Sequence, residues 1–268
     1  MKMGKKIAAL FLAAAMAAGL TACSGGNTAS GTQSGDAAGG GTVIMSTNAG
    51  FEPFEYMEGD EYKGIDIEIA NKIAEKMGKT LEIHNVEFKT VITEVQSGKA
   101  QFAAAGISIT DERKEQVDFS DTYFVATQSI IVLKDSDIKS RTDLEGKKVG
   151  VQEGTTGDEF CKNEDGSSDI QVGETVRYNT GMEAVADLIK GRIDAVVIDD
   201  FPAPKLVERN SDNVVKLEDA LTQEDYAIAV KKGDTETLKV INEVLKEMKE
   251  NGELDALIDQ YRSVLEGE

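Results

Sequence analysis

The stretch TLEIHNVEFKTVITEVQSGKAQFAAAGISITDER, residues 80–113, contains the pattern on which the fold prediction rests. Residues 81–83 predict a strand, residues 89–96 a helix that ends near Gly98, and residues 101–105 a second strand. A strand, a helix and a strand in this order are typical of parallel sheets covered by helices. The segment thus predicts one repeating unit of an α/β fold.

The same alternation continues on both sides of this stretch. Upstream, residues 42–45 predict a strand, and residues 66–77 place apolar side chains at helical spacing before Gly78. Downstream, the expected strands are 129–133, 148–151, 176–178, 194–198 and 226–230, and the expected helices are 156–162, 182–190, 202–210, 235–250 and 252–265. The sequence therefore predicts an α/β protein with mostly parallel sheets flanked by helices.

Composition narrows the possible partners. The chain has 268 residues, of which 49 are acidic and 29 basic, for a formal net charge of −20, and 40% are hydrophobic. This is the composition of a globular protein of one or two domains. A strong negative field repels phosphate backbones and anionic lipid headgroups, so we expect no nucleic-acid partner.

The N-terminus predicts export and anchoring. Lysines precede the apolar run 7–20, which is shorter than the ~20 residues that span a bilayer, so we interpret residues 1–22 as a secretory signal peptide. It ends in LTAC, which resembles the bacterial lipobox, in which Cys23 becomes the lipid-modified (diacyl, palmitate-type) N-terminus. Residues 23–41 then form a lipidated cysteine and a Gly/Ser-rich tether with a reach of roughly 25 Å. We expect an extracytoplasmic protein held at the bacterial cell membrane by this lipid alone, although an incidental cysteine is the alternative.

The segment GISITDER, residues 106–113, leaves a strand through small residues and then presents a guanidinium. The planar fork of Arg113 suits a carboxylate, and Ser108 adds a hydroxyl and a backbone donor. The alternative, which the sequence alone favours, is that Arg113 pairs with Asp111 or Glu112 on a solvated helix.

Two further segments end strands with polar groups. VGVQEGTT, residues 149–156, runs into a helix start, where free N–H groups bind anions, with N-capping by Thr156 as the alternative. DAVVIDD, residues 194–200, ends in adjacent carboxylates whose side chains point to opposite sides of a strand. We expect Asp199 to face a cleft and hold a cation, and the other aspartate to cap the next helix.

The order of these motifs resembles a known family. NAGFEPFE (48–55), GIDIE (64–68), GISITDER (106–113) and VDFS (117–120) are followed by GVQEGT (150–155), DAVVID (194–199) and YAIA (226–229). Together they resemble the extracellular solute-binding proteins of polar amino-acid ABC importers, the family of the glutamine- and histidine-binding proteins, over residues 42–265.

The resemblance implies an α/β, two-lobed periplasmic-binding-protein fold with two interlobe crossings, near residues 123–127 and 225–229. Lobe 1 would then comprise residues 42–124 and 229–268. Lobe 2 would comprise residues 125–228 with the hinge strands.

Carried over residue by residue, the resemblance also implies a ligand site. Arg113 would clamp the α-carboxylate of an amino acid with backbone donors at Ser108 and Thr156. The α-ammonium would meet the Gly106 carbonyl, the Ser108 hydroxyl and Asp199. Phe51 and Phe88 would form apolar walls. The full set of expected ligand-binding residues is Asn48, Phe51, Phe88, Ala105, Gly106, Ser108, Arg113, Gln152, Thr155, Thr156 and Asp199.

Neutral residues mark the expected side-chain end of this site. Asn48 stands where glutamine- and basic-amino-acid-binding relatives have an acid, and Gln152 and Ile198 stand where a glutamine-binding relative has lysine and histidine. We therefore expect an uncharged polar or thioether-like ligand rather than a cationic one. Glu52 and Asp66 could overturn this expectation, but we expect Asp66 to cap its helix and Glu52 to face solvent.

The predicted function is capture of a free amino acid and its delivery to a membrane ABC permease, by a monomer without cofactor, metal or enzyme activity. The alternatives are a ligand-binding sensor component that works with a separate signalling partner, and a periplasmic dehydratase-like enzyme on the same fold. Against catalysis, His84 lies at a strand end without an identifiable carboxylate partner, and Cys161 is expected to be buried and inert. Against a metal, Asp66 and Glu68 diverge and no His/Cys cluster occurs.

Overall fold

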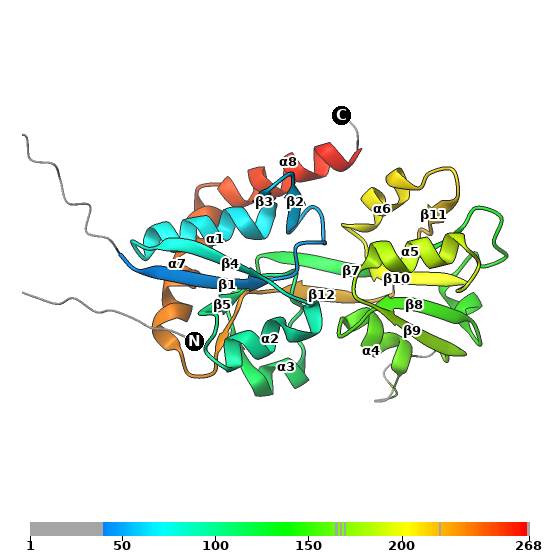
Figure 1. The fold of residues 1–268 in the computed structure, drawn as a ribbon, viewed down its shortest axis with the longest axis horizontal. Helices are drawn as coiled ribbons and strands as arrows, with labels where there is room; N and C mark the ends of the chain where they lie inside the picture. Colours follow the sequence, from blue (N-terminus) through cyan, green and yellow to red (C-terminus); the bar gives the residue numbers. More distant parts are fainter. Residues whose placement is uncertain (1–39, 164–165, 167, 169, 220, 267–268) are drawn as a thin grey trace, which may run out of the picture. The chain divides into compact units, whose positions relative to one another are not determined.

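The computed structural model describes residues 40–163, 166, 168, 170–219 and 221–266. The predicted signal peptide, Cys23 and nearly all of the predicted tether lie outside the described residues. Two large β-sheets, each with its own helices, make up the described part of the chain (Figure 1). None of the helices described there combines the length and the apolar content needed to span a membrane.

The first sheet has five strands in the order β4 (Thr80–Asn85), β1 (Thr42–Thr47), β5 (Phe102–Ala103), β13 (Ala229–Lys231) and β6 (Val117–Phe119). β1 runs parallel to β4 and β5, whereas β13 runs antiparallel to β5 and β6. Its helices are α1 (Ile65–Lys76), α2 (Phe88–Gln96), α3 (Asp111–Gln116), α7 (Thr235–Glu250) and α8 (Glu253–Glu266). We call this group of elements the first lobe.

The apolar stripe of α1 explains how the first lobe packs. Ile65, Ile69 and Ile73 are fully buried in the same core cluster as strand residues of β1 and β5. Their spacing of four residues places them on one face of the helix, as predicted for Ile69 and Ile73, whereas Ile65 precedes the predicted helix 66–77. The helix ends at Met77, and Gly78 follows with a φ of 64°, a conformation that favours glycine.

The second sheet has six strands. Five follow the order β11 (Val214–Lys216), β7 (Phe124–Leu133), β10 (Ala195–Asp199), β8 (Lys148–Gln152) and β9 (Glu174–Tyr178), and β12 (Gln223–Tyr226) pairs with β7. The flanking elements are η1 (Arg141–Leu144), α4 (Thr156–Lys162), α5 (Gly181–Ile189) and α6 (Ala203–Arg209). We call this group the second lobe. Strand β10 is buried throughout, as expected for a central strand covered on both faces.

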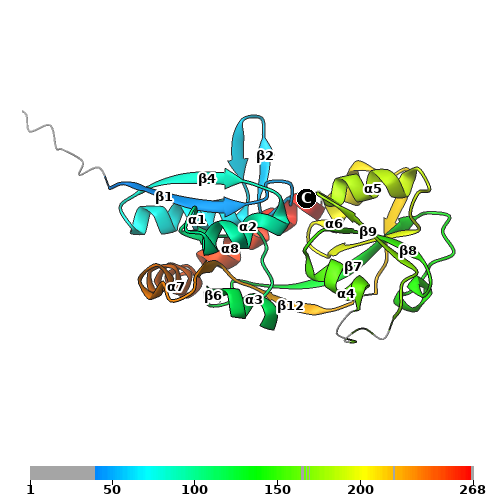
Figure 2. The same cartoon turned by 60° about the horizontal axis from the view of Figure 1, so that its bottom comes forward.

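Two strands connect the lobes. The chain leaves the first sheet after β6 and enters the second as β7, and it returns from β12 to β13. β7 and β12 pair antiparallel, with Phe124 opposite Tyr226, and both run between the two groups of elements in Figures 1 and 2. The predicted fold class, two α/β lobes with two crossings, is confirmed. The expectation of mostly parallel sheets is wrong, because β7 pairs antiparallel with β10, β11 and β12, and β13 pairs antiparallel with β5 and β6.

Several short elements were not expected from the sequence. They are the hairpin of β2 (Tyr56–Glu58) and β3 (Glu61–Lys63), strands β6, β11 and β12, and the 3₁₀ helix η1. The predicted strand 226–230 is broken, because Ala227 N–H bonds the Ile107 carbonyl and Ile228 N–H bonds the Ser120 hydroxyl instead of a strand ladder. The predicted strand 101–105 shortens to β5, since its continuation turns through Gly106.

Candidate ligand-binding site

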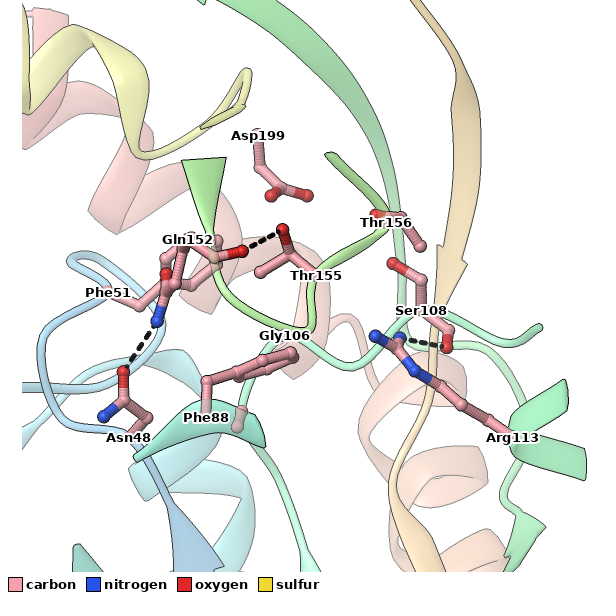
Figure 3. A pocket seen from close by; sticks show the side chains of 11 residues that line it. Asn48, Phe51, Phe88, Gly106, Ser108, Arg113, Gln152, Thr155, Thr156 and Asp199 are labelled. Carbon is pink, nitrogen blue, oxygen red and sulfur yellow. Dashed lines mark hydrogen bonds between the residues drawn. The ribbon is translucent and has the colours of Figure 1, made fainter. Parts of the chain in front are cut away.

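The eleven residues expected to bind a ligand all line one pocket, which contains about 290 Å³ of empty space between the lobes (Figure 3). First-lobe residues meet residues from the ends of β8 and β10 and from the start of α4. The structure therefore brings the predicted set together, while its role in binding stays a prediction.

Arg113 is the fixed cation of the pocket. The Thr110 hydroxyl caps α3 by accepting the Arg113 N–H at 3.1 Å, which places Arg113 in the first turn. Its side chain is only 6% exposed, and its guanidinium donates to the carbonyls of Ser108 at 2.8 Å and Gly154 at 2.9 Å. It also lies over the Phe88 ring at 5.7 Å from the centroid. Burial lowers the pKa of Arg113, yet a guanidinium stays cationic.

The interpretation of Arg113 as a solvated surface pair is wrong. Asp111 pairs with Lys114 at 3.0 Å, and the guanidinium of Arg113 is turned away from solvent toward backbone carbonyls of both lobes. The reason is the cap at Thr110, because it starts the helix where Arg113 faces the interior and Asp111 faces water.

Asp199 is the buried carboxyl group of the pocket. It ends β10, is 5% exposed, and accepts a hydrogen bond from the Tyr226 hydroxyl. Burial, with the nearby charge of Glu224, raises the pKa of Asp199 to about 7, against the opposing effect of hydrogen bonds from Tyr226 and Gln128. A carboxyl group with a pKa near neutrality becomes ionised when a cationic group binds next to it.

The neighbouring residues of Asp199 differ from expectation. Asp200 does not cap α6, because the N-cap position of that helix is Pro202, which makes no side-chain capping bond. Asp200 instead forms an ion pair with Lys216 at 2.5 Å. Ile198 is buried in the core of the second lobe and does not line the pocket. Alternation along β10 produces both results, since only every second side chain can face the cleft.

The capping role considered for Thr156 belongs to Thr155. The Thr155 hydroxyl accepts the Asp158 N–H at 3.2 Å and donates to the Gln152 carbonyl at 2.8 Å. Thr156 is thus the first residue of α4, and its N–H has no acceptor within the helix. Its hydroxyl donates to Glu224 at 2.6 Å.

An amide pair closes the other end of the pocket. Gln152 Nε2 donates to Asn48 Oδ1 at 2.9 Å, and Asn48 Nδ2 donates to the Val86 carbonyl at 2.7 Å. Figure 3 shows this pair next to the rings of Phe51 and Phe88. Because both hydrogen bonds fix the Asn48 amide, Gln152 directs its nitrogen to Asn48 and keeps its oxygen as an acceptor.

Asp66 supports the pocket from behind and does not cap its helix. The cap position of α1 is Gly64, without a side-chain bond. Asp66 is fully buried, and its Oδ2 accepts the Gly106 N–H at 2.9 Å, while burial raises its pKa to about 6. Gly106 has a φ of 54°, and a Cβ there would lie 2.8 Å from a Phe51 ring carbon. A glycine is therefore required at this point of the wall.

Glu52 does not face solvent freely. It pairs with Arg209 of the second lobe at 2.5 Å, and its side chain is 16% exposed. Lys89 and Glu153 form a second ion pair between the lobes at 2.9 Å. With the Gln152–Asn48 and Arg113–Gly154 hydrogen bonds, these contacts place the structure in a closed arrangement.

The structure shows the surroundings of His84 and Cys161, the two residues that the sequence analysis excluded from a catalytic role. His84 contacts Glu94 at 3.1 Å and Glu82 at 3.3 Å, so the expectation that it lacks a carboxylate partner is wrong; both partners come from the nearby β4 and α2. Cys161 is 4% exposed, which confirms that the thiol is buried, and this burial raises its pKa to about 12, in line with the expected low reactivity.

Sequence reasoning missed Glu224. This half-buried residue of β12 accepts hydrogen bonds from the hydroxyls of Ser108 at 2.5 Å and Thr156 at 2.6 Å. It lies in the polar stretch QED, directly before the YAIA motif. Its position beside a recognised motif was the available signal, but the contacts span more than sixty residues of sequence.

The fold and the site define a class of protein. Two α/β lobes joined by two strands close over a pocket that holds one buried guanidinium and one buried carboxylate, the construction of a receptor that binds a small solute between its lobes. The chain belongs to the bacterial extracellular solute-binding proteins, family 3, whose model matches residues 43–264. The predicted family is confirmed.

Similar proteins cover nearly the whole chain. The arginine-binding extracellular protein ArtP of Bacillus subtilis (strain 168) is 38% identical over 255 residues, which cover 94% of this chain and 96% of that protein. An ancestral arginine-binding protein bound to arginine is 40% identical with a TM-score of 0.75, covering 82% of this chain and 97% of that one. An ancestral arginine-binding protein bound to glutamine is 39% identical with a TM-score of 0.75, and the match covers 82% of this chain and 97% of that one.

Proposed function

We propose that this chain captures a free amino acid between its lobes by the α-carboxylate and the α-ammonium, and delivers it to a membrane ABC permease. One observation carries the proposal. Arg113 and Asp199, two buried groups of opposite charge from different lobes, line the same pocket. A desolvated site tolerates such charges when the ligand supplies the complementary pair, and the backbone of an amino acid is such a pair.

The carboxylate end is built around Arg113. Two backbone carbonyls hold its guanidinium in place, and its other N–H groups remain for a bidentate bond to an α-carboxylate. The N–H of Thr156, at the start of α4, supplies a second donor and the favourable end of a helix dipole. The backbone N–H of Ser108 would complete the set.

The ammonium end is built around Asp199. The Gly106 carbonyl and the Ser108 hydroxyl lie on the facing lobe and supply two neutral acceptors. Three acceptors match the three protons of an ammonium group. Because Asp199 belongs to the second lobe and the other two to the first, the ligand joins the lobes and favours closure.

The side-chain end favours a ligand with N–H donors. Phe51 and Phe88 offer ring faces on which a planar guanidinium or amide can stack, and Gln152 offers an acceptor oxygen. We therefore propose arginine first and glutamine second, the ligands that the similar structures contain. The Gln152 amide, whose neutrality argued against a cation in the sequence, acts here as an acceptor, and the ring faces attract the charge.

The remaining features of the proposal concern the whole protein. A lipid on Cys23 anchors the chain outside the cytoplasmic membrane, the receptor acts as a monomer, and the ligand leaves it chemically unchanged. The lipobox-like ending LTAC supports the anchor. Membership of a family of solute-binding proteins supports transport over catalysis.

A ligand screen tests the proposed function. The purified protein is mixed with each of the twenty common amino acids, and the melting temperature is followed by fluorescence. A ligand at 100 times its Kd stabilises the native state by about 2.7 kcal/mol, so we expect clear shifts with L-arginine or L-glutamine. The Arg113→Ala variant should show a much smaller shift or none. A flat response of the wild-type protein to all twenty would refute the proposal.

A further inference from the structure

Glu224 connects the two lobes at the edge of the pocket without lining it. Its Oε2 accepts the Ser108 hydroxyl of the first lobe at 2.5 Å and the Thr156 hydroxyl of the second lobe at 2.6 Å. Its Oε1 accepts the Thr222 hydroxyl at 2.6 Å. Both carboxylate oxygens are thus occupied by hydroxyl donors, and the side chain is fixed from three directions.

These contacts determine what the two hydroxyls can offer to a ligand. A serine or threonine hydroxyl has one proton and two acceptor lone pairs. Because Ser108 and Thr156 each give their proton to Glu224, their oxygens can present only lone pairs to the pocket. An oxygen in that state accepts from an ammonium and repels a carboxylate.

Thr156 is constrained further by its second neighbour. Gln128 Nε2 donates to the Thr156 hydroxyl oxygen at 3.3 Å. The Thr156 hydroxyl thus accepts a hydrogen bond from Gln128 of β7 and donates one to Glu224 of β12. Ser108, by contrast, has no second partner among the described side chains, and it lines the pocket with its lone pairs still available. Ser108 is therefore the hydroxyl whose polarity matters most for the ligand.

We propose that Glu224 is a positioning residue for specificity: by taking the protons of the Ser108 and Thr156 hydroxyls, it makes the pocket select ligands with an α-ammonium. The inference rests on the proposed amino-acid function and extends it to a residue that does not touch the ligand. Glu224 also places a negative charge close to Asp199, which strengthens the preference for a cation at that end.

The neighbouring residue supplies a matched control. Asp225 is exposed, and alternation along β12 turns its side chain to the opposite side from Glu224. Glu224 pairs in register with Ala126, and Asp225 with Val125, so both substitutions test the same strand. The Asp225→Asn variant removes the same charge at nearly the same place without reaching either hydroxyl.

The experiment compares ligands that differ only in the α-ammonium. The probes are L-arginine with 5-guanidinopentanoic acid, and L-glutamine with glutaramic acid, measured by calorimetry on the wild-type protein, Glu224→Gln and Asp225→Asn. Because hydrogen bonds to charged groups are stronger than neutral ones, we expect Glu224→Gln to lose about tenfold to a hundredfold in affinity for the amino acid. We expect less than about a threefold change for the deamino analogue, and no change in either affinity for Asp225→Asn.

A double-mutant cycle separates an effect of Glu224 on the Ser108 hydroxyl from a general effect on the two strands, β7 and β12, that connect the lobes. In a Ser108→Ala background the hydroxyl is gone, so Glu224→Gln should lose less amino-acid affinity than it does in the wild-type background. Equal losses for the amino acid and its deamino analogue, or full additivity in the cycle, would overturn the proposal. Unchanged affinity in Glu224→Gln would overturn it as well. A wild-type protein that binds neither amino acid refutes the proposed function itself, which is a different result.

Discussion

Ligand affinity should depend on pH through Asp199. Burial raises the pKa of this carboxyl to about 7 in the absence of ligand, whereas an ammonium ligand requires the ionised form. Below pH 7, binding must first remove a proton, which weakens the observed affinity about tenfold per pH unit. At pH 5 the affinity should thus be about 100-fold weaker than at pH 8, or about 3 kcal/mol. The charges of the amino-acid backbone stay constant over this range.

The sign for stability is opposite. The unfolded chain binds the proton of an ordinary aspartate with a pKa of about 3.9, so the raised pKa of Asp199 means that the folded, unliganded state binds this proton more tightly. Its contribution to stability is fully present below about pH 4 and is lost as the pH rises through 7. Affinity and ligand-free stability should therefore change in opposite directions between pH 5 and 8.

Calorimetry measures both quantities. Titrations with L-arginine in buffers of different ionisation enthalpy should detect release of about half a proton per ligand near pH 7. The Asp199→Asn variant should bind weakly at pH 8 and lose the pH dependence, while the buried carboxyl of Asp66 remains in both proteins. An affinity that is flat from pH 5 to 8, or an equal pH dependence in Asp199→Asn, would refute the reasoning.

Further perturbations give distinct expected results. Arg113→Ala leaves the ligand carboxylate unpaired in a dry cleft and should lose roughly 2 to 5 kcal/mol of binding free energy. Arg113→Lys should also bind weakly, because an ammonium lacks the planar fork of a guanidinium. The exposed Arg192→Ala variant is the calorimetric control and should bind normally. Cys23→Ser should move the protein from the membrane fraction to the soluble fraction with unaltered affinity; recovery in the membrane fraction would contradict lipid anchoring. Asn48→Asp adds a carboxylate at the side-chain end and should raise the ratio of arginine to glutamine affinity, a ratio that stays constant if this end does not touch the side chain. Mass spectrometry should recover the ligand unchanged after incubation, and a product that disappears in Asp199→Asn would indicate an enzyme.

Much of the fold was predictable because it rests on local periodicity. The spacing of Ile65, Ile69 and Ile73 identifies one buried face of a helix without knowledge of its partner. The continuous apolar run of β10 likewise indicates a central strand. The short strands β6 and β12 carry no such pattern, since each is defined by a partner distant in the chain.

The residues that line the pocket could be predicted at the positions that motifs mark, but not where long-range contacts determine the neighbours. Thr110 as a cap, which turns Arg113 inward, is a local feature, yet the sequence alone favoured a surface pair for Arg113. The buried position of Asp66 depends on Gly106, forty residues away, and that of Glu224 on hydroxyls from both lobes. Contacts of this kind follow only once the lobes are assembled.

The contacts between the lobes indicate which interactions control closure. The Lys89–Glu153 ion pair is exposed at both partners, and Arg209 in the Glu52 pair is 47% exposed. Such surface pairs contribute about 0 to 1 kcal/mol each, because water and salt screen them. Hydrogen bonds from a ligand to the buried Arg113 and Asp199 are stronger, since these groups are charged and shielded from solvent. A ligand can shift the closure equilibrium only by the difference in its affinity for the two states, and on the proposed function we expect these two buried charges to supply most of that difference. We therefore expect the exposed pairs to adjust the closed state, and the backbone of a bound amino acid to contribute most of its added stability.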